Sequence, residues 1–555
     1  MWTGIVRKLT ARRRTGNNLC CMMRDQLTAA LAGALDSLGI EIDASTIELE
    51  RPARREHGDW SSNVAMANWK PAGRGNPREL AGEITNHLNA NLPQHVELVE
   101  IAGPGFVNFR LFDTWLHDEL KATVDAGVER FGRHDFGDAH INVEFVSANP
   151  NKPLHAGHAR GAVYGDSIAR LLKAVGYQVT TEFYLNDRGV QMTLFAESLA
   201  ARKRGEDVPE NGYHGDYLVE WAAEMPDGAD VFEWGYARAL RSHKETLGRV
   251  NVHHDVWSSE KALVDAGKVP AAVAELTAAG KVFEEDGATW LRTTDFGDDK
   301  DRVIVKADGD MTYLTPDIAY HRDKFERADK LINVWGADHH GYIARMKAAM
   351  HFLGHEPEDL EIIITQIVSL QRDGEEVAMS GRLGDMVSFD EVIDEVGPDA
   401  ARYTFLTQSM DTRQTVDLGA LAEKSMDNPV HYVQYATARI NSLANNAESA
   451  GHTRGNLDAS DLTLLTHDRE LDILRVLNAF PEIVAIAARE RAPHKVTTWL
   501  RELAAAFHGF YHDCYVVGDG VSSELTQARL WLIEAARIGL TAGLDLVGVS
   551  APLEM

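Results

Sequence analysis

Residues 143–158, VEFVSANPNKPLHAGH, decide the fold of this chain. Apolar and polar residues alternate over 141–145, which predicts a half-buried strand, and two prolines then prevent further strand pairing. From Ala156 the apolar residues follow helical spacing as far as Gly176, which is placed to end the helix. A strand, a turn and a helix in this order predict the first unit of a nucleotide-binding α/β fold. The N-terminus of such a helix is an anion site.

Two histidines stand at the predicted helix start. His155 and His158 are three positions apart, so both side chains can face an anion bound there. Imidazole donors in this place can stabilise charge that develops on a phosphate during its transfer. Gly157 has no side chain, so a flat base such as adenine can lie against the backbone, and Lys152 adds a positive charge just upstream. Taken alone, the HxGH tetrapeptide is equally typical of a helix cap or of surface histidines.

The composition is that of an ordinary globular protein. The chain has 555 residues, 44% hydrophobic and 25% charged, so roughly two to four domains are expected. No apolar run approaches the roughly 20 residues that a membrane-spanning helix needs. Three cysteines give no disulfide framework and no metal-ligand spacing. The net charge of −28 disfavours a broad RNA-binding surface but does not exclude a local basic one.

The first 22 residues, MWTGIVRKLTARRRTGNNLCCM, differ from the rest of the chain. They contain five basic residues and no acidic one, whereas the patterned sequence starts near Met23. An Arg-rich leader without acidic residues is typical of a mitochondrial transit peptide. Alternatively, the start codon is set too early and Met22 or Met23 is the true first residue, which is the interpretation that we favour. We expect no fold in this segment.

Further motifs follow in a fixed order along the chain. They are YLTPDIAYHRDKFER at 313–327, GADHHGY at 336–342 and NPVHYVQYATARI at 428–440. Together with SANPNKPLHAGHARGAVYGD, they resemble the arginyl-tRNA synthetases, a family of class I aminoacyl-tRNA synthetases. RREHGDWSSNVAM at 54–66 and AGPGFVNFRL at 102–111 resemble the additional N-terminal domain of that family. The resemblance covers nearly the whole chain after residue 22.

The resemblance implies an α/β fold of several domains. We expect a Rossmann-type parallel-sheet catalytic domain, an α+β N-terminal domain that recognises the tRNA D-loop, and an α-helical C-terminal anticodon-binding domain. The expected limits are 1–22 for the leader, 23–118, 119–410 with an insertion, and 411–555. The residue pattern itself predicts strands that alternate with helices, as in a parallel sheet. These strands are expected at 141–146, 179–185, 303–306, 331–335 and 361–368.

The resemblance also implies an arginine–tRNA ligase that uses ATP with Mg²⁺. Such an enzyme activates L-arginine to arginyl-adenylate and then transfers arginine to the 3′-terminal ribose of tRNA(Arg). His155 and His158 would stabilise the α-phosphate in the transition state. We also expect a cytoplasmic monomer with no membrane partner. The ATP-binding positions implied by the motifs are Gly157, Asp338, Met379 and Ser380.

The second ATP signature of the class departs from its usual sequence. The matching stretch, VAMSGRLG at 377–384, keeps its methionine and serine but has Ala378 and Gly381 where lysines would bring positive charge to the pyrophosphate. Arg382 and Lys152 can supply that charge instead, as the lysine before the histidine motif does in family members that lack the loop lysine. Alternatively, activation is impaired and the chain is a degenerate paralogue. We favour compensation, because the other motifs are intact.

Substrate choice should depend on carboxylates, since a guanidinium needs planar anionic partners. The resemblance implies that Tyr313 and Asp317 hold the side chain and amino group of arginine, and that Glu284 pairs with its guanidinium. Asn149 would hold the backbone end, and Gln191 would line the same pocket with Asn186. The arginine-binding prediction is therefore Asn149, Tyr313, Asp317, Glu284, His339 and Gln191.

Contacts with tRNA are predicted at both ends of the chain. Phe106 and Asn108 alternate along a strand and share one face, where an aromatic ring can stack and an amide can reach a base edge. Tyr435 and the terminal Met555 are further candidates in the helical domain, although core packing is an alternative for the aromatic residues. Two rival functions are a nucleotidyltransferase without a tRNA partner and a catalytically dead tRNA-binding protein.

Overall fold

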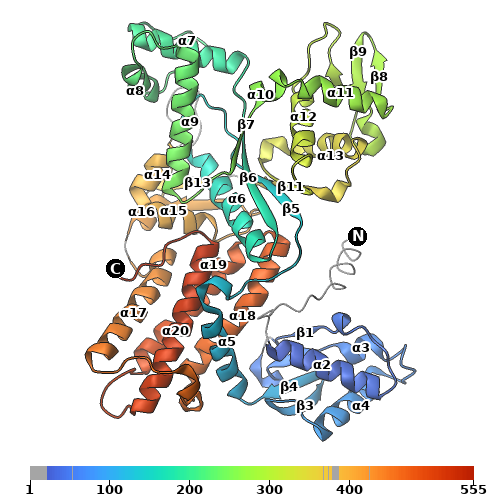
Figure 1. The fold of residues 1–555 in the computed structure, drawn as a ribbon, viewed down its shortest axis with the longest axis vertical. Coiled ribbons are helices and arrows are strands. Elements are labelled where there is room, and N and C mark those ends of the chain that lie inside the picture. The colour runs from blue at the N-terminus through green and yellow to red at the C-terminus, as the bar shows by residue number, and fades with distance from the viewer. Residues whose placement is uncertain (1–21, 53, 367, 373, 378–386, 424) are drawn as a thin grey trace.

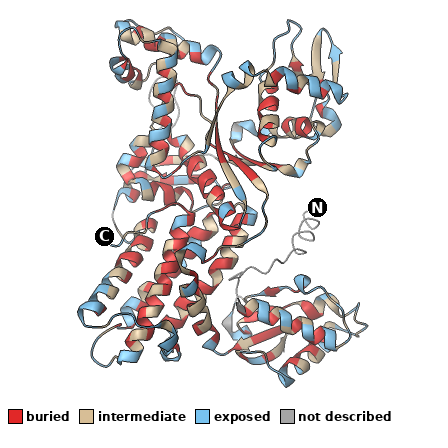
Figure 2. Ribbon diagram, in the orientation of Figure 1, coloured by how far each residue is buried: buried red, intermediate tan, exposed pale blue. Residues whose placement is uncertain are grey.

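The computed structural model describes residues 22–555 except 53, 367, 373, 378–386 and 424 (Figure 1). A central parallel sheet lies between two lobes on one side and a helical bundle on the other, and an α+β domain lies beside the bundle. The leader at 1–21 lies outside the described residues. Buried residues concentrate in the central sheet and the bundle, whereas exposed residues dominate the outer surfaces of the lobes (Figure 2).

The N-terminal domain is an antiparallel sheet covered by helices. Its strand order is β1-β2-β4-β3. Leu27 and Leu31 on α2 are fully buried and form the apolar face of this helix. Residues 103–105 join β3 to β4. The elements are α2 (Met22–Ser37), β1 (Leu49–Glu50), β2 (Trp60–Ser62), α3 (Val64–Asn68), α4 (Pro77–Ala90), β3 (Val96–Ala102) and β4 (Phe106–Leu111).

The central sheet has five parallel strands in the order β12-β11-β5-β6-β7. Its first crossover helix, α6 (Ala156–Ala174), confirms the helix predicted after the histidine motif, and Gly176 follows it with a φ of 100°. The direction in which successive strands are added to the sheet reverses at β5. Ligands are therefore expected at the carboxyl ends of the strands around β5. The strands are β5 (His140–Glu144), β6 (Gln178–Leu185), β7 (Val256–Ser259), β11 (Lys330–Gly336) and β12 (Leu360–Thr365).

One predicted strand does not belong to this sheet. The segment at 303–306 falls on β10 (Arg302–Val305), which pairs antiparallel with β9 in a separate sheet of order β10-β9-β8. The fifth parallel strand is instead β7, which the sequence pattern did not reveal. Both segments are four residues long, so their own periodicity does not indicate which partner strand they join.

One lobe connects β6 to β7 and a second lobe connects β7 to β11 (Figure 1). The first lobe is helical and the second surrounds the small antiparallel sheet. The first consists of α7 (Val190–Arg204), α8 (Tyr217–Glu224) and α9 (Val231–Arg249). The second comprises α10 (Glu260–Asp265), α11 (Lys268–Ala278), β8 (Val282–Glu285), β9 (Ala288–Leu291), β10 and α12 (Leu314–Phe325), with α13 (Ile343–Phe352) packed nearby.

A third small sheet and three short helices follow β12. In this sheet β13 pairs parallel with β15 and antiparallel with β14. The helices α14 and α15 pack against α6 and so extend the catalytic core. The bounds are β13 (Val368–Arg372), β14 (Glu375–Val377), α14 (Phe389–Val396), α15 (Pro398–Phe405), β15 (Gln414–Asp417) and α16 (Leu418–Ala422).

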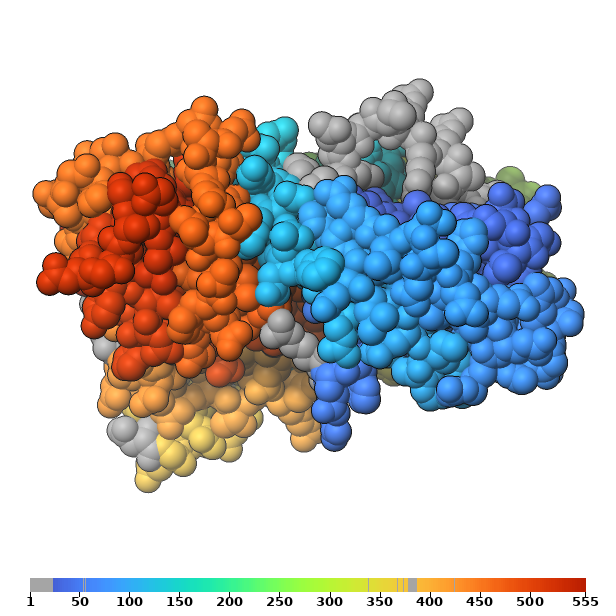
Figure 3. Space-filling model, turned by 90° about the horizontal axis from the view of Figure 1, so that it is seen from below, coloured from blue at the N-terminus to red at the C-terminus, as the bar shows by residue number. Residues whose placement is uncertain are grey.

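The C-terminal region is helical, as predicted. Its long helices also pack against α5 (Thr114–Arg130), which the sequence-based limits divide between the first two domains. Seen from below, the N-terminal domain lies against α5 and the bundle (Figure 3), and Arg24 pairs with Glu482 across that contact at 3.0 Å. The helices are α17 (Pro429–Ser449), α18 (Asp468–Glu490), α19 (His494–Asp513) and α20 (Ser523–Leu546). In the described part of the chain, no helix is long and apolar enough to cross a membrane.

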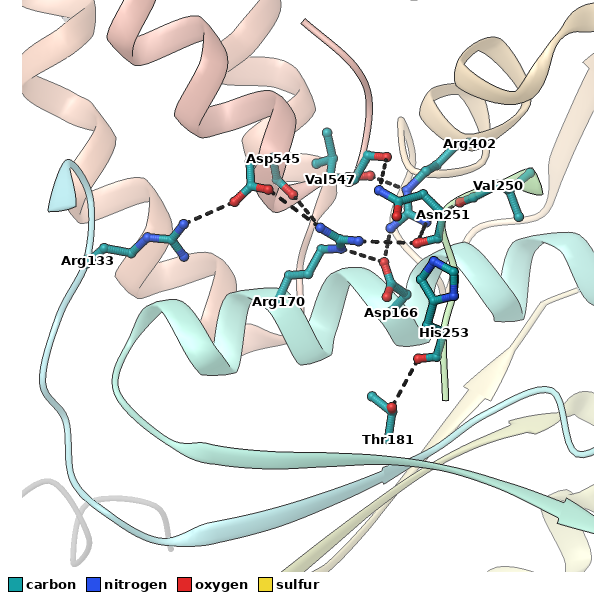
Figure 4. A network of polar contacts seen from close by, with 11 residues as sticks. Arg133, Asp166, Arg170, Thr181, Val250, Asn251, His253, Arg402, Asp545 and Val547 are labelled. Carbon is teal, nitrogen blue, oxygen red and sulfur yellow. Dashed lines mark hydrogen bonds and ion pairs between the residues drawn. The ribbon is translucent and has the colours of Figure 1, made fainter. Parts of the chain in front are cut away.

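A buried polar network joins α6 to the C-terminal end of the bundle (Figure 4). Arg402 is 1% exposed, pairs with Asp166 of α6 and donates to the carbonyls of Val547 and Val250. Arg170 pairs with the same Asp166 at 2.7 Å and donates to the carbonyl of Asp545. Although burial alone would raise it, these two guanidinium groups hold the pKa of Asp166 below its usual value.

Candidate active site

The histidine pair caps the helix that it begins. His155 Nδ1 accepts a hydrogen bond from the Gly157 backbone N–H at 3.2 Å, and His158 Nδ1 accepts one from the His155 N–H at 3.2 Å. The two rings lie 3.8 Å apart, centre to centre. Because each Nδ1 is an acceptor, a neutral ring must carry its proton on Nε2. Both Nε2–H groups can therefore donate to an anion at the start of α6.

Burial keeps both imidazole rings neutral, because it lowers their pKa values. Burial, assisted by the nearby Lys152, lowers the pKa of His155 to about 4, and burial with its histidine neighbours lowers the pKa of His158 well below 6.5. Lys152 itself lies partly buried in the turn, and loss of water lowers its pKa as well. The site therefore offers two neutral N–H donors beside one lysine.

The second ATP signature lies outside the described residues. Met379, Ser380 and Arg382 all fall within 378–386, so their predicted roles stay predictions. The residues that follow are bound to the histidine turn: the Ala156 N–H donates to the Val387 carbonyl at 3.0 Å, and the Phe389 N–H donates to the Leu154 carbonyl at 2.8 Å. Residues 387–389 therefore lie directly beside the histidine turn.

Residues expected to bind arginine meet at the carboxyl ends of β5 and β6. The Asn149 amide donates to Gln191 Oε1 at 2.7 Å, which joins two residues that the sequence predicted separately. Asp317 lies in the first turn of α12. Burial, together with the carboxylates of Glu144 and Glu260, raises the pKa of Asp317 to about 7 against the opposing charge of Lys324. We call this cluster of carboxylates the acidic pocket, and its negative charge favours a cationic ligand.

A buried charge network fixes the position of α12 in this pocket. Lys324 is fully buried and donates to Glu144 at 2.6 Å and to Asn333 Oδ1 at 2.7 Å. Asn333 contacts His321 Nε2 at 2.6 Å, and His321 Nδ1 bonds the backbone carbonyl of Asp317 at 2.7 Å. Every member of this chain of contacts has a partner, so the network holds the Asp317 backbone against β5 and β11.

Glu260 is a pocket residue that sequence reasoning missed. It begins α10 directly after β7, its side chain is 13% exposed, and it lies 3.6 Å from Arg188. When the Asn186 amide is oriented with its nitrogen toward Glu260, that nitrogen donates to Glu260 Oε2 at 3.2 Å. A carboxylate just after a parallel strand would have been a signal, but that strand, β7, was itself not predicted.

Other predicted residues are placed differently. Tyr313 precedes α12 and is 87% exposed. Glu284 is exposed on β8, where it accepts a hydrogen bond from Thr289 at 2.7 Å, and β8 belongs to the antiparallel sheet. His339 lies in the turn after β11, with its ring 6.0 Å from that of Trp335. Asp338 occupies the same turn, but its side chain is not among those described.

The predicted tRNA contacts differ in exposure. Phe106 is half-buried, whereas Asn108 is 3% exposed and its amide is already used: it accepts from Ser61 and donates to the His57 carbonyl, both at 2.7 Å. In this structure Asn108 therefore holds the loop before β2. We expect Phe106 to be the accessible member of the pair.

The C-terminal candidates lie on or beside α17. The Arg439 guanidinium stacks on the rings of Tyr435 and Tyr511 at 4.2 and 4.4 Å. Thr437 donates to the Pro552 carbonyl at 2.8 Å and Asn441 to the Leu553 carbonyl at 3.1 Å, so the last residues run along the helix. Met555 is 57% exposed at the end of this segment. A cation and aromatic rings next to an exposed chain end form a surface on which nucleotide bases can stack.

The comparisons with known proteins cover the same three regions. The family model "tRNA synthetases class I (R), catalytic domain" matches residues 129–211 and 234–444, which together with the fold defines a class I aminoacyl-tRNA synthetase. "Arginyl tRNA synthetase N terminal domain" matches 24–111, and "DALR anticodon binding domain" matches 433–555. The chain belongs to the arginyl-tRNA synthetase family.

Relatives match along nearly the full length. The Arginine--tRNA ligase of Bacillus licheniformis is 43% identical over 562 residues, covering 97% of this chain and 100% of that relative. That of Frankia alni is 43% identical over 551 residues, covering 96% and 99%. The solved Thermus thermophilus arginyl-tRNA synthetase has a TM-score of 0.74 at 24% identity, covering 96% of this chain and 100% of that one, which supports the fold.

Proposed function

We propose that this chain is an arginine–tRNA ligase. In the first step a carboxylate oxygen of L-arginine attacks the α-phosphorus of ATP, pyrophosphate leaves, and arginyl-adenylate forms. In the second step a hydroxyl of the terminal ribose of tRNA(Arg) attacks the acyl carbon and AMP leaves. The observation that carries this proposal is the cluster of carboxylates around Asp317, together with a neutral histidine pair at a helix N-terminus, in a chain of this family.

The ATP roles follow from the histidine geometry. His155 and His158 would donate their Nε2–H groups to the α-phosphate, where negative charge grows in the transition state. Lys152 and Arg382 would hold the β- and γ-phosphates. Gly157 would leave room for adenine, and the remaining predicted ATP contacts are Asp338, Met379 and Ser380.

The arginine roles follow from the acidic pocket. Asn149 and Gln191 would bind the backbone end of arginine, with His339 and Tyr313 at the pocket edge. Asp317 and Glu260 would face the positive charge of the substrate. Glu260 joins this set because it contributes to the raised pKa of Asp317. Glu284 lies on another sheet, and its role in binding the guanidinium stays a prediction.

For tRNA, we propose that Phe106 contacts the D-loop while Asn108 supports it from behind, and that Tyr435 and Met555 meet the anticodon loop. The corresponding domain limits remain 23–118, 119–410 and 411–555, with α5 packed on the last of these.

Mg²⁺ would arrive bound to ATP, because the described residues contain no group of three His, Cys, Asp or Glu side chains that could hold a metal ion. We further propose a cytoplasmic monomer.

The decisive experiment incubates purified chain with ATP, labelled arginine and bulk tRNA, and measures acid-precipitable arginyl-tRNA. Citrulline, which lacks the guanidinium charge, is the matched negative substrate. Charging with arginine alone is expected. Retained tRNA binding without charging would replace the proposal with the catalytically inactive tRNA-binding protein. ATP–pyrophosphate exchange without tRNA charging would favour a nucleotidyltransferase with no tRNA partner.

A further inference from the structure

The turn that carries Lys152 is held from outside by the helical lobe α7–α9. His243 of α9 is 0% exposed, and its Nε2 lies 2.9 Å from the Lys152 backbone carbonyl. The preceding residue is held by the same lobe: the Asn151 amide donates to the Tyr213 hydroxyl at 2.9 Å, and the Tyr217 hydroxyl donates to the Asn151 carbonyl at 2.9 Å. Two side chains from the lobe, His243 and Tyr217, therefore bond the backbone of this turn, and Tyr213 bonds the side chain of Asn151.

The protonation state of His243 is determined by its surroundings. Burial lowers its pKa to about 4, so the ring is neutral at physiological pH and carries a single proton. A carbonyl can only accept, so that proton must sit on Nε2, facing Lys152. Nδ1 is buried and has no hydrogen-bond partner among the described residues. The ring therefore makes one directed bond, to the lysine backbone.

The same helix also contacts the chain just after the second ATP signature. Thr246 donates to Asp390 of α14 at 2.5 Å, and Arg249 pairs with Asp390 and Asp394. Since α14 begins at Phe389, whose N–H is bonded to the histidine turn, α9 touches both the turn that carries Lys152 and the helix that follows the second ATP signature. A helix in this position can fix the distance between them.

The position of Lys152 matters more here than in a chain with the usual loop lysines. Positions 378 and 381 are alanine and glycine, so the charge on the leaving phosphates must come from elsewhere. A lysine side chain is long and flexible, and the only rigid part of its placement is its backbone. A shift of about 1 Å in a positioning contact can cost a factor of about 100 in rate.

We propose that His243 is a positioning residue that presents Lys152 to the β- and γ-phosphates of ATP through its bond to the Lys152 carbonyl. The inference rests on the proposed function, because it concerns the activation step of that reaction. His243 does not touch substrate. It acts through Lys152, because its hydrogen bond fixes the backbone from which the Lys152 side chain extends.

The test uses the full-length chain and ATP–pyrophosphate exchange in the presence of tRNA. His243→Ala is expected to lower kcat for exchange about 10- to 100-fold, with the KM for arginine and the affinity for tRNA changed less than about twofold. His243→Gln should restore most of the rate, since its amide nitrogen can occupy the Nε2 position. His243→Asn is the matched control: its shorter amide cannot reach the Lys152 carbonyl, so it should behave as alanine does.

A double-mutant cycle separates positioning from general damage. If His243 acts through Lys152, then His243→Ala should cause little further loss of exchange in a Lys152→Ala background. Additive losses, or equal rates for the glutamine and asparagine variants, would overturn the inference. If the alanine variant fails to fold, the glutamine–asparagine comparison still decides. A wild-type chain without any exchange would overturn the proposed function and this inference with it, whereas an active wild type with an unaffected His243→Ala variant overturns the inference alone.

Discussion

At the scale of single residues, we propose that the charge state of Asp317 most directly determines arginine binding. Its carboxyl group lies among Glu144 and Glu260 with Lys324 as the opposing charge, and its pKa is raised to about 7. Because the pKa of Asp317 is raised on folding, the ligand-free protein loses folding stability as the pH rises from about 4 to 7. A bound guanidinium adds positive charge, lowers the pKa of Asp317 and relieves that cost.

Arginine affinity is therefore expected to rise with pH between about 6 and 8 and then to level off. Below pH 7 the empty pocket holds a proton on Asp317 that the guanidinium must displace, and above pH 8 that proton is already gone. Calorimetry in two buffers of different ionisation enthalpy would detect close to one proton released per arginine at pH 6 and none at pH 8.5. A pH-independent affinity across this range would contradict the assignment.

The two candidate guanidinium partners can be compared directly. Glu260→Gln should raise the KM for arginine about 10- to 100-fold, because a hydrogen bond to a charged group contributes about 1.5–3 kcal/mol. It should also shift the pH dependence of arginine binding to lower pH, since Glu260 helps to raise the pKa of Asp317. Glu284→Gln, on the separate sheet, is expected to leave both nearly unchanged. Steady-state kinetics over pH 6–8 tests the pair, and the reverse ranking would support Glu284.

At the scale of elements, the close approach of α6 to β5 places the histidine pair. A Cβ at Gly165 would overlap the ring of Phe145, which follows β5 and is fully buried. Glycine is therefore required at this point of the helix by packing and not by its backbone angles. Four residues earlier, Gly161 has open space at the same position.

This difference within one helix yields a matched pair of variants. Gly165→Ala is expected to lower stability by about 1–3 kcal/mol, since overpacking forces helix and strand apart. Gly161→Ala should be neutral or stabilising by up to about 1 kcal/mol, because alanine is the better helix former. Melting temperatures of both variants would show the contrast. Equal destabilisation would indicate that the helix does not pack as described.

At the scale of the whole molecule, the polar network around Arg402 connects the catalytic core to the helical bundle (Figure 4). Asp166 belongs to the helix that starts with the histidine pair, while Val547 precedes the segment that ends at Met555. The Asn251 amide also donates to the Gly548 carbonyl at 3.3 Å. The end of the bundle is thus bonded both to α6 and to the chain just after α9.

Arg402→Met is expected to cost about 3–5 kcal/mol, because it leaves the buried Asp166 short of a partner. The bundle should then melt separately from the catalytic core, which calorimetry would record as two transitions. Arg133→Met removes a partly exposed partner of Asp545 in the same network and should cost no more than about 1 kcal/mol. A single unshifted transition for Arg402→Met would rule out this coupling.

Several elements could be predicted because their signals are local. The strand before the histidines, the helix from Ala156 and its end at Gly176 each follow from the spacing of neighbouring apolar residues and glycine. The segment at 303–306 was correctly predicted as a strand but assigned to the wrong sheet, because a four-residue strand does not specify its partner.

The sequence by itself determined the family, the order of the domains and the histidine pair with its lysine, since these depend on motifs and short-range periodicity. Only the tertiary structure decided that Glu260 joins Asp317, that Asn108 is buried against its own loop, and that His243 holds the carbonyl of Lys152. Each of these contacts joins residues between about 50 and 90 positions apart in the chain. Their pairing depends on how the sheet and lobes pack, and no local pattern records it.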